Sequence, residues 1–475
     1  MKKKKVLLVY TNTEKAPYPV PPIGLCLVAQ AIKAKYDVMV FDGLMRPREN
    51  IFAVIRDFNP HYVGFGVRNI DNIVMDNPTY FIDDIFDTFI APVRAHSNAV
   101  CIVGGSGFSV FPQEILERFG IEYGIAGEGE TSFSALLDAL DKGESVDGIP
   151  GVVVKGAPRT LSPDFQYSTA IQTLDESEID KWIDFSPYRQ RGAYPIQTKR
   201  GCSQQCIYCT YPCIEGTTYR RRDPKAIANE IENVHHRLGD VLFEFVDSTF
   251  NDPPGHAEEI CREIIKKNMK VRLRTMGINP HRASKELFDL MISAGFTQID
   301  CTPDSGSGVM LANLRKNFTK KELETTAGII RQCNIPTMWF FIFGGPGETE
   351  ETIGETFSFI DEFVSPQDMV YMMAGLRVYP KTALYDIALS EGSFQKDGSI
   401  LKPVFYVTKS MPRQRIHALL FEAAQKRHNC VLAADSTPPP QLLQKAMELR
   451  NKQNLQEPMF RTLLRIRLIN RARSL

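Results

Sequence analysis

The stretch from Arg200 to Cys213 reads RGCSQQCIYCTYPC and holds four of the chain's ten cysteines. The first three follow a C-x3-C-x2-C spacing at Cys202, Cys206 and Cys209, and Cys213 comes four positions later. An apolar run typical of a strand precedes the stretch, and a helical pattern follows it. The cysteines are therefore predicted to lie on a loop at the carboxyl end of a strand.

Composition limits what these cysteines can be doing. The chain has 475 residues, enough for two or three domains, with 56 basic and 56 acidic residues. Zero net charge argues against binding nucleic acid mainly by charge. The apolar run in MKKKKVLLVY is too short for a secretory signal, and no run reaches the length of a membrane span. We expect a cytoplasmic protein with no membrane or nucleic-acid partner, in which thiols stay reduced and a disulfide framework is excluded.

Three interpretations of the cysteine cluster remain. A zinc site favours a second cysteine pair or histidines at ligand spacing, and His235 and His236 fall instead in an amphipathic helical stretch. Cysteine thiolates gathered on one loop are typical of iron–sulfur ligation. Three ligands on a four-iron cluster leave one iron open to a substrate or cofactor. Zinc and a chance cluster of buried cysteines are the alternatives, and we interpret Cys213 as a packing residue.

The chain divides into four regions. Residues 1–145 alternate short apolar runs with helical patterns, which predicts an open parallel α/β sheet of the flavodoxin or Rossmann type. Residues 146–190 are proline-containing and predict a linker with a few short strands. Residues 191–395 carry six strand–helix repeats, which predict a partial (β/α)6 barrel with its site at the strand carboxyl ends. Residues 396–475 predict a helical C-terminal region whose basic end we interpret as a solvated helix face.

The C-x3-C-x2-C motif, with Tyr208 before its last cysteine, resembles the radical S-adenosylmethionine enzymes. The resemblance implies a [4Fe-4S] cluster held by Cys202, Cys206 and Cys209 and S-adenosylmethionine bound at its open iron. It also implies an external electron donor of the flavodoxin or ferredoxin type. In that family the reduced cluster cleaves the cofactor to a 5′-deoxyadenosyl radical, while the protein binds, orients and shields.

Further stretches resemble that family by position. FEFVDSTFNDPP would line the methionine end of the cofactor, CTPDSGSGVMLANLRKN its ribose, and FFIFGGPGETEET its adenine. Pro303 and Asp304 stand where the family usually has Val-Glu at the ribose contact. Plain turn chemistry is the alternative explanation for the glycines. The implied contacts are Tyr208, Asp247, Ser248, Asp304, Ser305, Gly344 and Gly345.

The first region resembles the cobalamin-binding domain fused to many of these enzymes. The stretches that carry the likeness are PPIGLCLVAQAI, VCIVGGSGF and YGIAGEGETSFSALL. Glycines at strand ends let a bulky ligand approach the backbone, where open α/β sheets bind ligands. A generic flavodoxin-like sheet shares the same rhythm and is the alternative. The implied cobalamin contacts are Pro22, Gly24, Gly66, Arg68, Asn69, Gly104, Gly105, Ser106, Gly127, Glu128 and Gly129.

One departure concerns the lower face of cobalt. Some cobalamin domains carry Asp-x-His-x-x-Gly after the first strand, whereas the loop here reads TNTEKAPYPVPPIG and the first histidine is His61. Histidine ligation from that loop is thereby excluded. GFGVRNIDN resembles the loop of the tryptophan 2-C-methyltransferases in which an arginine faces cobalt. That likeness gives Arg68 a catalytic role, because a protonated guanidinium has no lone pair to donate. Contact with a corrin amide or phosphate, or pairing with Asp71, are the alternatives.

Together the resemblances imply a cobalamin-dependent radical S-adenosylmethionine methyltransferase. A methyl group would pass from S-adenosylmethionine via methylcobalamin to a carbon, or a phosphorus, of a small substrate held between the two domains. A polar transfer without a substrate radical is a variant. The alternatives are a non-methylating rearrangement or cyclisation and a non-catalytic iron–sulfur or cobalamin sensor. A methylthiotransferase would need a further cysteine triad, and the first region has only Cys26 and Cys101.

Overall fold

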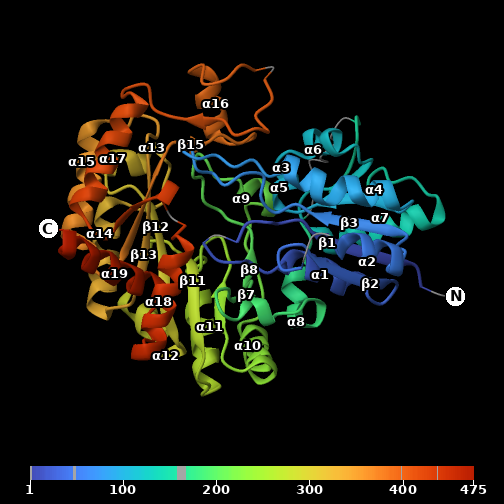
Figure 1. Cartoon of the computed structure of the whole chain (residues 1–475), viewed down its shortest axis with the longest axis horizontal. Helices are drawn as coiled ribbons and strands as arrows, with labels where there is room; N and C mark the ends of the chain where they lie inside the picture. The colour runs from blue at the N-terminus through green and yellow to red at the C-terminus, as the bar shows by residue number, and fades with distance from the viewer. Residues whose placement is uncertain are drawn as a thin grey trace.

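A computed structural model of the chain describes residues 3–15, 17–46, 50–157, 167–396, 398–435 and 437–474. Two α/β units lie side by side along the long axis, and the C-terminal helices pack on the second unit (Figure 1). The predicted fold class is confirmed. Part of the predicted linker, residues 158–166, lies outside the described residues.

The first unit is a six-stranded sheet of order β2-β1-β3-β4-β5-β6. All neighbours pair in parallel except β5 and β6, which are antiparallel, and β6 comes from the region predicted as linker. The strands are β1 (Lys5–Tyr10), β2 (Asp37–Asp42), β3 (Tyr62–Gly66), β4 (Val100–Gly104), β5 (Tyr123–Ile125) and β6 (Val152–Val154).

Helices cover both faces of this sheet because its central strands are apolar on both sides. Leu8 and Tyr10 of β1 enter the core beneath α1 and α7, whereas Leu7 and Val9 enter the core on the other face. Runs of this kind are typical of parallel strands buried on both faces. The helices are α1 (Ile23–Ile32), α2 (Asn50–Phe58), α3 (Ile82–Ile85), α4 (Ala91–His96), α5 (Ser106–Val110), α6 (Pro112–Phe119) and α7 (Gly129–Lys142).

The second unit is a seven-stranded parallel sheet of order β17-β14-β13-β12-β11-β10-β7. Six of its strands are the predicted ones. The seventh, β17, comes from the C-terminal region, which was predicted to be helical, and extends the open edge at β14. The strands are β7 (Tyr194–Ile196), β10 (Leu242–Phe245), β11 (Arg272–Ile278), β12 (Phe296–Asp304), β13 (Thr337–Phe343), β14 (Met369–Ala374) and β17 (Cys430–Leu432).

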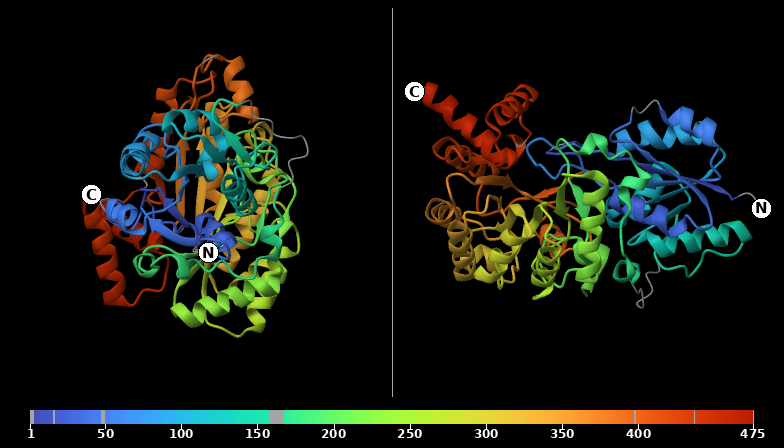
Figure 2. Two further views of the ribbon diagram at one scale, coloured as in Figure 1. Left: turned by 90° about the vertical axis from the view of Figure 1, so that its right-hand side faces the viewer. Right: turned by 90° about the horizontal axis from the view of Figure 1, so that it is seen from below.

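Helices between these strands form the outer layer, and several begin with side-chain caps. Thr319 and Glu322 form a reciprocal capping box at the start of α14, which satisfies amide groups that the first turn leaves free. The helices are α9 (Tyr211–Glu215), α10 (Pro224–Leu238), α11 (His256–Lys266), α12 (Lys285–Ala294), α13 (Gly308–Asn313), α14 (Lys320–Cys333), α15 (Glu350–Phe363), α16 (Ala383–Ser390), α17 (Arg413–Lys426), α18 (Pro440–Gln453) and α19 (Met459–Ser474). The α18–α19 pair packs on one side of the barrel (Figure 2).

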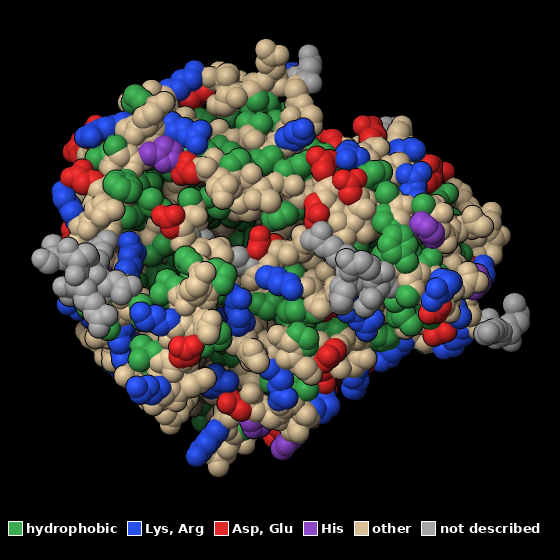
Figure 3. All heavy atoms as spheres, viewed as in Figure 1, with side chains coloured by type: hydrophobic (Ala, Val, Ile, Leu, Met, Phe, Trp, Pro, Cys, Tyr) green, Lys and Arg blue, Asp and Glu red, His purple; other side chains and the backbone are tan. Residues whose placement is uncertain are grey.

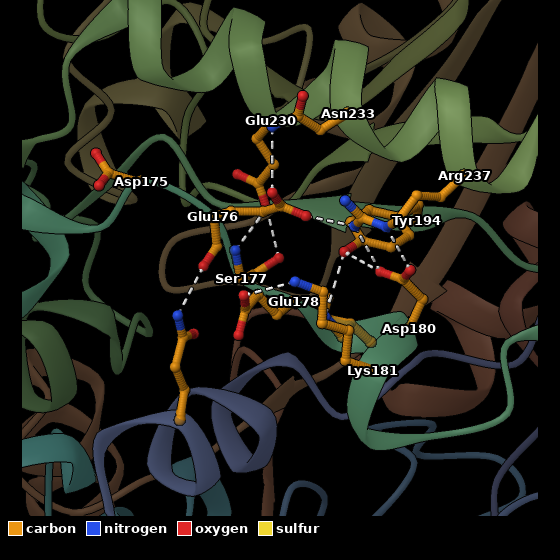
Figure 4. A network of polar contacts seen from close by, with 12 residues as sticks. Asp175, Glu176, Ser177, Glu178, Asp180, Lys181, Tyr194, Glu230, Asn233 and Arg237 are labelled. Atoms are coloured by element: carbon orange, nitrogen blue, oxygen red, sulfur yellow. Dashed lines mark hydrogen bonds and ion pairs between the residues drawn. The ribbon is translucent and has the colours of Figure 1, made fainter. Parts of the chain in front are cut away.

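The end of the linker is bound firmly to the barrel. Around the short helix α8 (Ile179–Trp182), Ser177 donates its backbone N–H and its hydroxyl to the buried Glu230 of α10. Arg237, also of α10, pairs with Asp180, and the Tyr194 hydroxyl donates to that same carboxylate (Figure 4). These contacts fix the crossing from the first unit into β7.

The two units also share a hydrophobic core. Apolar side chains of the first sheet belong to one buried cluster with Ile207 and Leu314 of the barrel. Beside them, Arg377 pairs with Asp71 at 2.8 Å, with both side chains at most 3% exposed. These buried contacts hold the carboxyl edge of the first sheet against the mouth of the barrel. Within the described residues, no helix combines the length and apolarity that crossing a bilayer requires.

Candidate active site

A cavity of about 1600 Å³ opens where the carboxyl edges of the two sheets meet. Its lining includes all three motif cysteines, Cys202, Cys206 and Cys209, together with Arg68 of the first unit. The volume exceeds the 300–1,000 Å³ typical of a site for one small ligand. Hydrophobic side chains gather along the junction of the two units in the space-filling view (Figure 3). The cavity has room for several ligands at once.

The motif cysteines lie on the loop between β8 (Lys199–Arg200) and α9, as predicted. Cys202 is buried, and its N–H donates to Gly216 O at 3.0 Å, while Cys209 N donates to Cys206 O at 3.2 Å. Burial raises the pKa of Cys206, and it raises that of Cys209 to about 12. Buried thiols of this kind need a cation to stabilise their thiolate form. Cys213 is exposed, which does not support its predicted role as a packing residue.

Tyr208, Asp304 and Lys316 form a buried group beside the cysteines. The Tyr208 hydroxyl donates to Asp304 Oδ2, and Lys316 Nζ pairs with the same oxygen at 2.8 Å. Burial alone would lower the pKa of Lys316, but Asp304 outweighs it and raises that pKa above its usual range. All three side chains line the cavity. Asp304, the residue that departs from the family pattern, therefore lies at the site, where it forms an ion pair with Lys316.

Other predicted S-adenosylmethionine contacts are distributed differently. Ser248 lines the cavity. Asp247 is buried beneath it, where it accepts from Thr198 and pairs with Lys199 Nζ at 3.2 Å. The Ser305 hydroxyl bonds with that of Thr356 at 3.0 Å, on the side facing α15.

Gly344 and Gly345 form the turn after β13. Gly344 has φ +91°, which favours glycine, and its N–H donates to Glu348 at 3.0 Å. Neither glycine is among the residues that line the cavity, whereas Phe341 and Ile342 just before them are. Four of the predicted S-adenosylmethionine contacts therefore do not line the cavity, and their role remains a prediction. They are Asp247, Ser305, Gly344 and Gly345.

The predicted cobalamin contacts lie at the carboxyl edge of the first sheet. Gly24, Gly105 and Ser106 are exposed there, and Ser106 Oγ donates to the carbonyl of Arg68 at 3.1 Å. Gly105 has φ +102°, and a Cβ there would lie 2.5 Å from Val67 O. The backbone is exposed at Gly24, Gly105 and Ser106 along this edge, whereas the close approach of Val67 O is what requires glycine at position 105. The edge is flanked by Pro22, Gly66, Asn69, Gly104, Gly127 and Gly129.

Arg68 follows β3 directly and projects into the cavity. Its side chain is exposed, and Nη1 donates to Asn69 Oδ1 at 3.1 Å. Asp71, an alternative partner considered for it, pairs with Arg377 instead. His61 lies at the opposite end of the same strand, and the described residues that line the cavity include no histidine.

The Glu128 side chain makes ion pairs that the resemblance does not imply, and its cobalamin contact remains a prediction. Its carboxylate pairs with Arg200 at 3.0 Å and with Arg220 at 2.5 Å, and its side chain is 6% exposed. Neighbouring Glu130 pairs with Arg200 at 2.6 Å. Glu128 therefore joins the first unit to the strands that carry the cysteine loop, and the resemblance gave no sign of this.

Sequence reasoning missed a second set of polar residues on the barrel's inner face. Tyr18, Arg274, Gln298 and Asp300 line the same cavity. The signal was present in RLRTMG and FTQIDCTPD, where polar residues alternate along strands that the barrel must bury. These alternating polar positions share one face of each strand, and that face lines the cavity.

Comparison with known proteins agrees with this geometry. Residues 196–360 match the Radical SAM superfamily, and residues 11–137 match the B12 binding domain. The chain is a radical S-adenosylmethionine enzyme with an N-terminal cobalamin-binding domain, and its cofactors are a [4Fe-4S] cluster, S-adenosylmethionine and cobalamin.

Individual relatives carry methyltransferase names. An uncharacterized methyltransferase of Pyrococcus horikoshii is 25% identical over 405 residues, covering 82% of this chain and 84% of the relative. The tryptophan 2-C-methyltransferase of Streptomyces laurentii is 26% identical over 401 residues, covering 70% and 67%. The solved structure of the methyltransferase TsrM from Kitasatospora setae, with tryptophan and a SAM analogue, superposes with a TM-score of 0.83 at 23% identity, covering 99% of this chain and 100% of that one.

The residues present fit these cofactors. Within the described residues, no three His, Cys, Asp or Glu side chains converge as ligands of a single ion would. The three motif thiols instead border one cavity, as suits a cluster that takes one cysteine per iron. Lys316 lies close enough to lower the pKa of Cys206 and Cys209 against the effect of burial. Of the predicted cobalamin contacts, Arg68 lines the cavity, and the exposed Gly24, Gly105 and Ser106 lie at the same carboxyl edge of the first sheet.

Proposed function

We propose that the protein is a methyltransferase that moves a methyl group from S-adenosylmethionine, through cobalamin, to a carbon or a phosphorus atom of a small substrate. When bound, S-adenosylmethionine supplies the methyl group and the radical precursor, and cobalamin carries the methyl group. An external donor of the flavodoxin or ferredoxin type reduces the cluster. The substrate lies between the two units.

One observation carries this proposal: Cys202, Cys206, Cys209 and Arg68 line a single cavity, although they come from different units. A methyl group that passes between two cofactors and a substrate needs all three in one enclosed space. A sensor that only bound each cofactor would have no need for a shared chamber.

Individual residues have separable parts in the proposal. Cys202, Cys206 and Cys209 hold the cluster, and Lys316 stabilises the thiolate charge of Cys206 and Cys209. Tyr208 and Asp304 border S-adenosylmethionine. Arg68 lines the cavity and would border cobalamin, and its protonated guanidinium has no lone pair to offer the metal. The Asp71–Arg377 pair keeps the two walls together.

The experiment is anaerobic reconstitution with hydroxocobalamin, a reductant and S-adenosylmethionine carrying a deuterated methyl group. Mass spectrometry should find the label in the cobalamin pool, and in a product once a substrate is supplied. The Cys213→Ser variant serves as the control for loss of a thiol. An unlabelled cobalamin pool in protein that contains cluster and cobalamin would refute the proposal.

A non-methylating rearrangement or cyclisation is the second candidate. Anaerobic magnesium-protoporphyrin IX monomethyl ester cyclases, one of which is 28% identical over 287 residues, are among the relatives. That match covers 56% of this chain and 49% of the cyclase, less than the matches to methyltransferases. Formation of 5′-deoxyadenosine and a changed product without the label would favour this candidate.

A further inference from the structure

Three neighbouring barrel strands place charged side chains in one layer of the barrel interior. Glu244 of β10 is level with Arg274 of β11, and Arg274 is level with Gln298 of β12. Asp300 follows two positions later, on the same face of β12. At about 3.3 Å per residue, Asp300 lies roughly 13 Å deeper than Asp304, well below the mouth of the barrel.

Arg274 is held in a fixed orientation there. Its Nε lies 2.6 Å from Glu244 Oε1, and its guanidinium carbon lies 4.0 Å from the centre of the Tyr18 ring. The Tyr18 hydroxyl donates to the same Glu244 oxygen at 2.8 Å. Tyr18 comes from the loop after β1, so the first unit reaches into the barrel to complete this group.

Two polar groups in this layer lack a short hydrogen bond among the described residues: Nη2 of Arg274 and the carboxylate of Asp300. Arg274 is 8% exposed and lines the cavity, and its Nη2 has no hydrogen-bond partner in the part of the chain that the structure describes. The Asp300 carboxylate is 9% exposed and accepts a long hydrogen bond of 3.4 Å from Gln298. Among the described residues no cation lies within salt-bridge distance of it. Burial raises the pKa of Asp300 to about 7, although Arg274 counteracts this.

A buried donor and a buried acceptor that both face a cavity indicate a ligand that satisfies both. Leaving either unpaired costs free energy that a ligand would recover. The cavity lining also includes the apolar and aromatic side chains of Met338, Phe340 and Tyr371. The site fits a ligand whose polar head binds Arg274 and Asp300 and whose flat or apolar body packs against these apolar side chains.

We propose that Asp300 and Arg274 form the subsite for the substrate's polar head, which carries a protonated amine for Asp300 and a carboxylate for Arg274. The substrate class is then an amino acid, or a compound with an amino-acid head, on an aromatic or other apolar body. This inference rests on the proposed function and deepens it. It places the substrate head inside the barrel, beside Tyr18 of the first unit.

Binding measurements on the reconstituted holoenzyme test this subsite. The probes are L-tryptophan, tryptamine, which lacks the carboxylate, and indole-3-propionate, which lacks the amine. The wild type should bind L-tryptophan most tightly. Asp300→Asn should weaken L-tryptophan and tryptamine by about 10- to 100-fold and leave indole-3-propionate unchanged, as expected for loss of one charge-assisted hydrogen bond.

Arg274 gives the converse pattern. The double variant Arg274→Gln with Glu244→Gln avoids a lone buried carboxylate and should weaken L-tryptophan and indole-3-propionate but not tryptamine. Cluster absorbance and cobalamin content, read on the same samples, show that each variant is folded and loaded. Asp289→Asn, at an exposed ion pair with Lys285, is the charge-matched control.

The outcomes separate this inference from the proposed function. If wild-type protein binds none of the three probes, or if Asp300→Asn weakens all three equally, the subsite is refuted even when cobalamin acquires the labelled methyl. If cobalamin acquires no label while the probe pattern holds, the proposed function fails and the subsite remains as a binding site. The predicted pattern together with the label supports both.

Discussion

Arg200 and Glu128 form an ion pair between the two units, with Nη1 3.0 Å from Oε2 and both side chains 6% exposed. Arg200 lies two residues before Cys202, the first cluster ligand. Burial would raise the pKa of neighbouring Glu130, but Arg200 outweighs it and leaves that pKa below its ordinary value. The contact between the units therefore also sets the position of the cysteine loop.

Removing this arginine should destabilise the junction. Arg200→Gln leaves two buried carboxylates sharing one cation, Arg220, which should lower the free energy of unfolding by about 3–5 kcal/mol. Urea denaturation measures the change. Lys285→Gln, which breaks an exposed pair, should cost less than about 1 kcal/mol. Equal losses in the two variants would show that the ion pair does not hold the units together.

The cluster assignment predicts a sharp difference among four cysteines. Cys202→Ser, Cys206→Ser and Cys209→Ser should each abolish the broad visible absorption of reconstituted protein and its bound iron. Cys213→Ser should retain both, because its thiol is exposed and does not line the cavity. Iron analysis and absorbance on anaerobic samples check this. Loss of iron in Cys213→Ser, with iron retained in the other three variants, would contradict the assignment.

Arg68 should control the lower face of cobalt. In protein loaded with cob(II)alamin, the wild-type electron paramagnetic resonance spectrum should lack nitrogen hyperfine splitting. Arg68→His should introduce it, because a neutral imidazole has a lone pair that guanidinium lacks. Arg189→His, at another exposed arginine that lines the cavity, should leave the spectrum unchanged. An unsplit spectrum for Arg68→His would place cobalt elsewhere.

His256 should make stability depend on pH. It is 1% exposed, and burial, with a further effect of Lys199, lowers its pKa to about 4. Between pH 4 and 6.5 the unfolded histidine takes up a proton that the folded one refuses, so acidification favours unfolding. The free energy of unfolding should fall by up to about 1.4 kcal/mol per pH unit below 6.5.

Denaturation of His256→Gln at pH 7 and at pH 5 isolates this contribution. Between pH 7 and pH 5, the free energy of unfolding of the variant should fall by about 2 kcal/mol less than that of the wild type. The exposed His236→Gln should behave as the wild type does. An identical pH dependence in His256→Gln and the wild type would show that this side chain does not cause it.

Sequence periodicity predicted both sheets because their strands are continuous apolar runs that need no distant partner to be recognised. It predicted short strands in the linker without placing β6, and it missed β17, which is three residues long and pairs with β14. A strand of that length within a region of helical patterns carries too few positions for a two-residue period to stand out. Its existence depends on tertiary contacts.

The residues of the site also divide into those that the sequence predicts and those that depend on the folded chain. The cysteine loop could be predicted because cluster ligation demands three thiols close together in the chain. Glu128 could not, because its partners Arg200 and Arg220 are some 70 to 90 residues away and only the folded chain brings them together. Arg274 and Asp300 were visible as polar positions in buried strands, but their shared orientation needs the strand register.

The central claim is that one chamber holds both the cluster and cobalamin, and magnetic coupling tests it most directly. Electron paramagnetic resonance should be recorded on anaerobic protein that contains the reduced cluster and cob(II)alamin together. The account predicts that each signal is broadened by the other and that cob(II)alamin narrows again in Cys202→Ser. Two unperturbed spectra that simply add in fully loaded protein would contradict it.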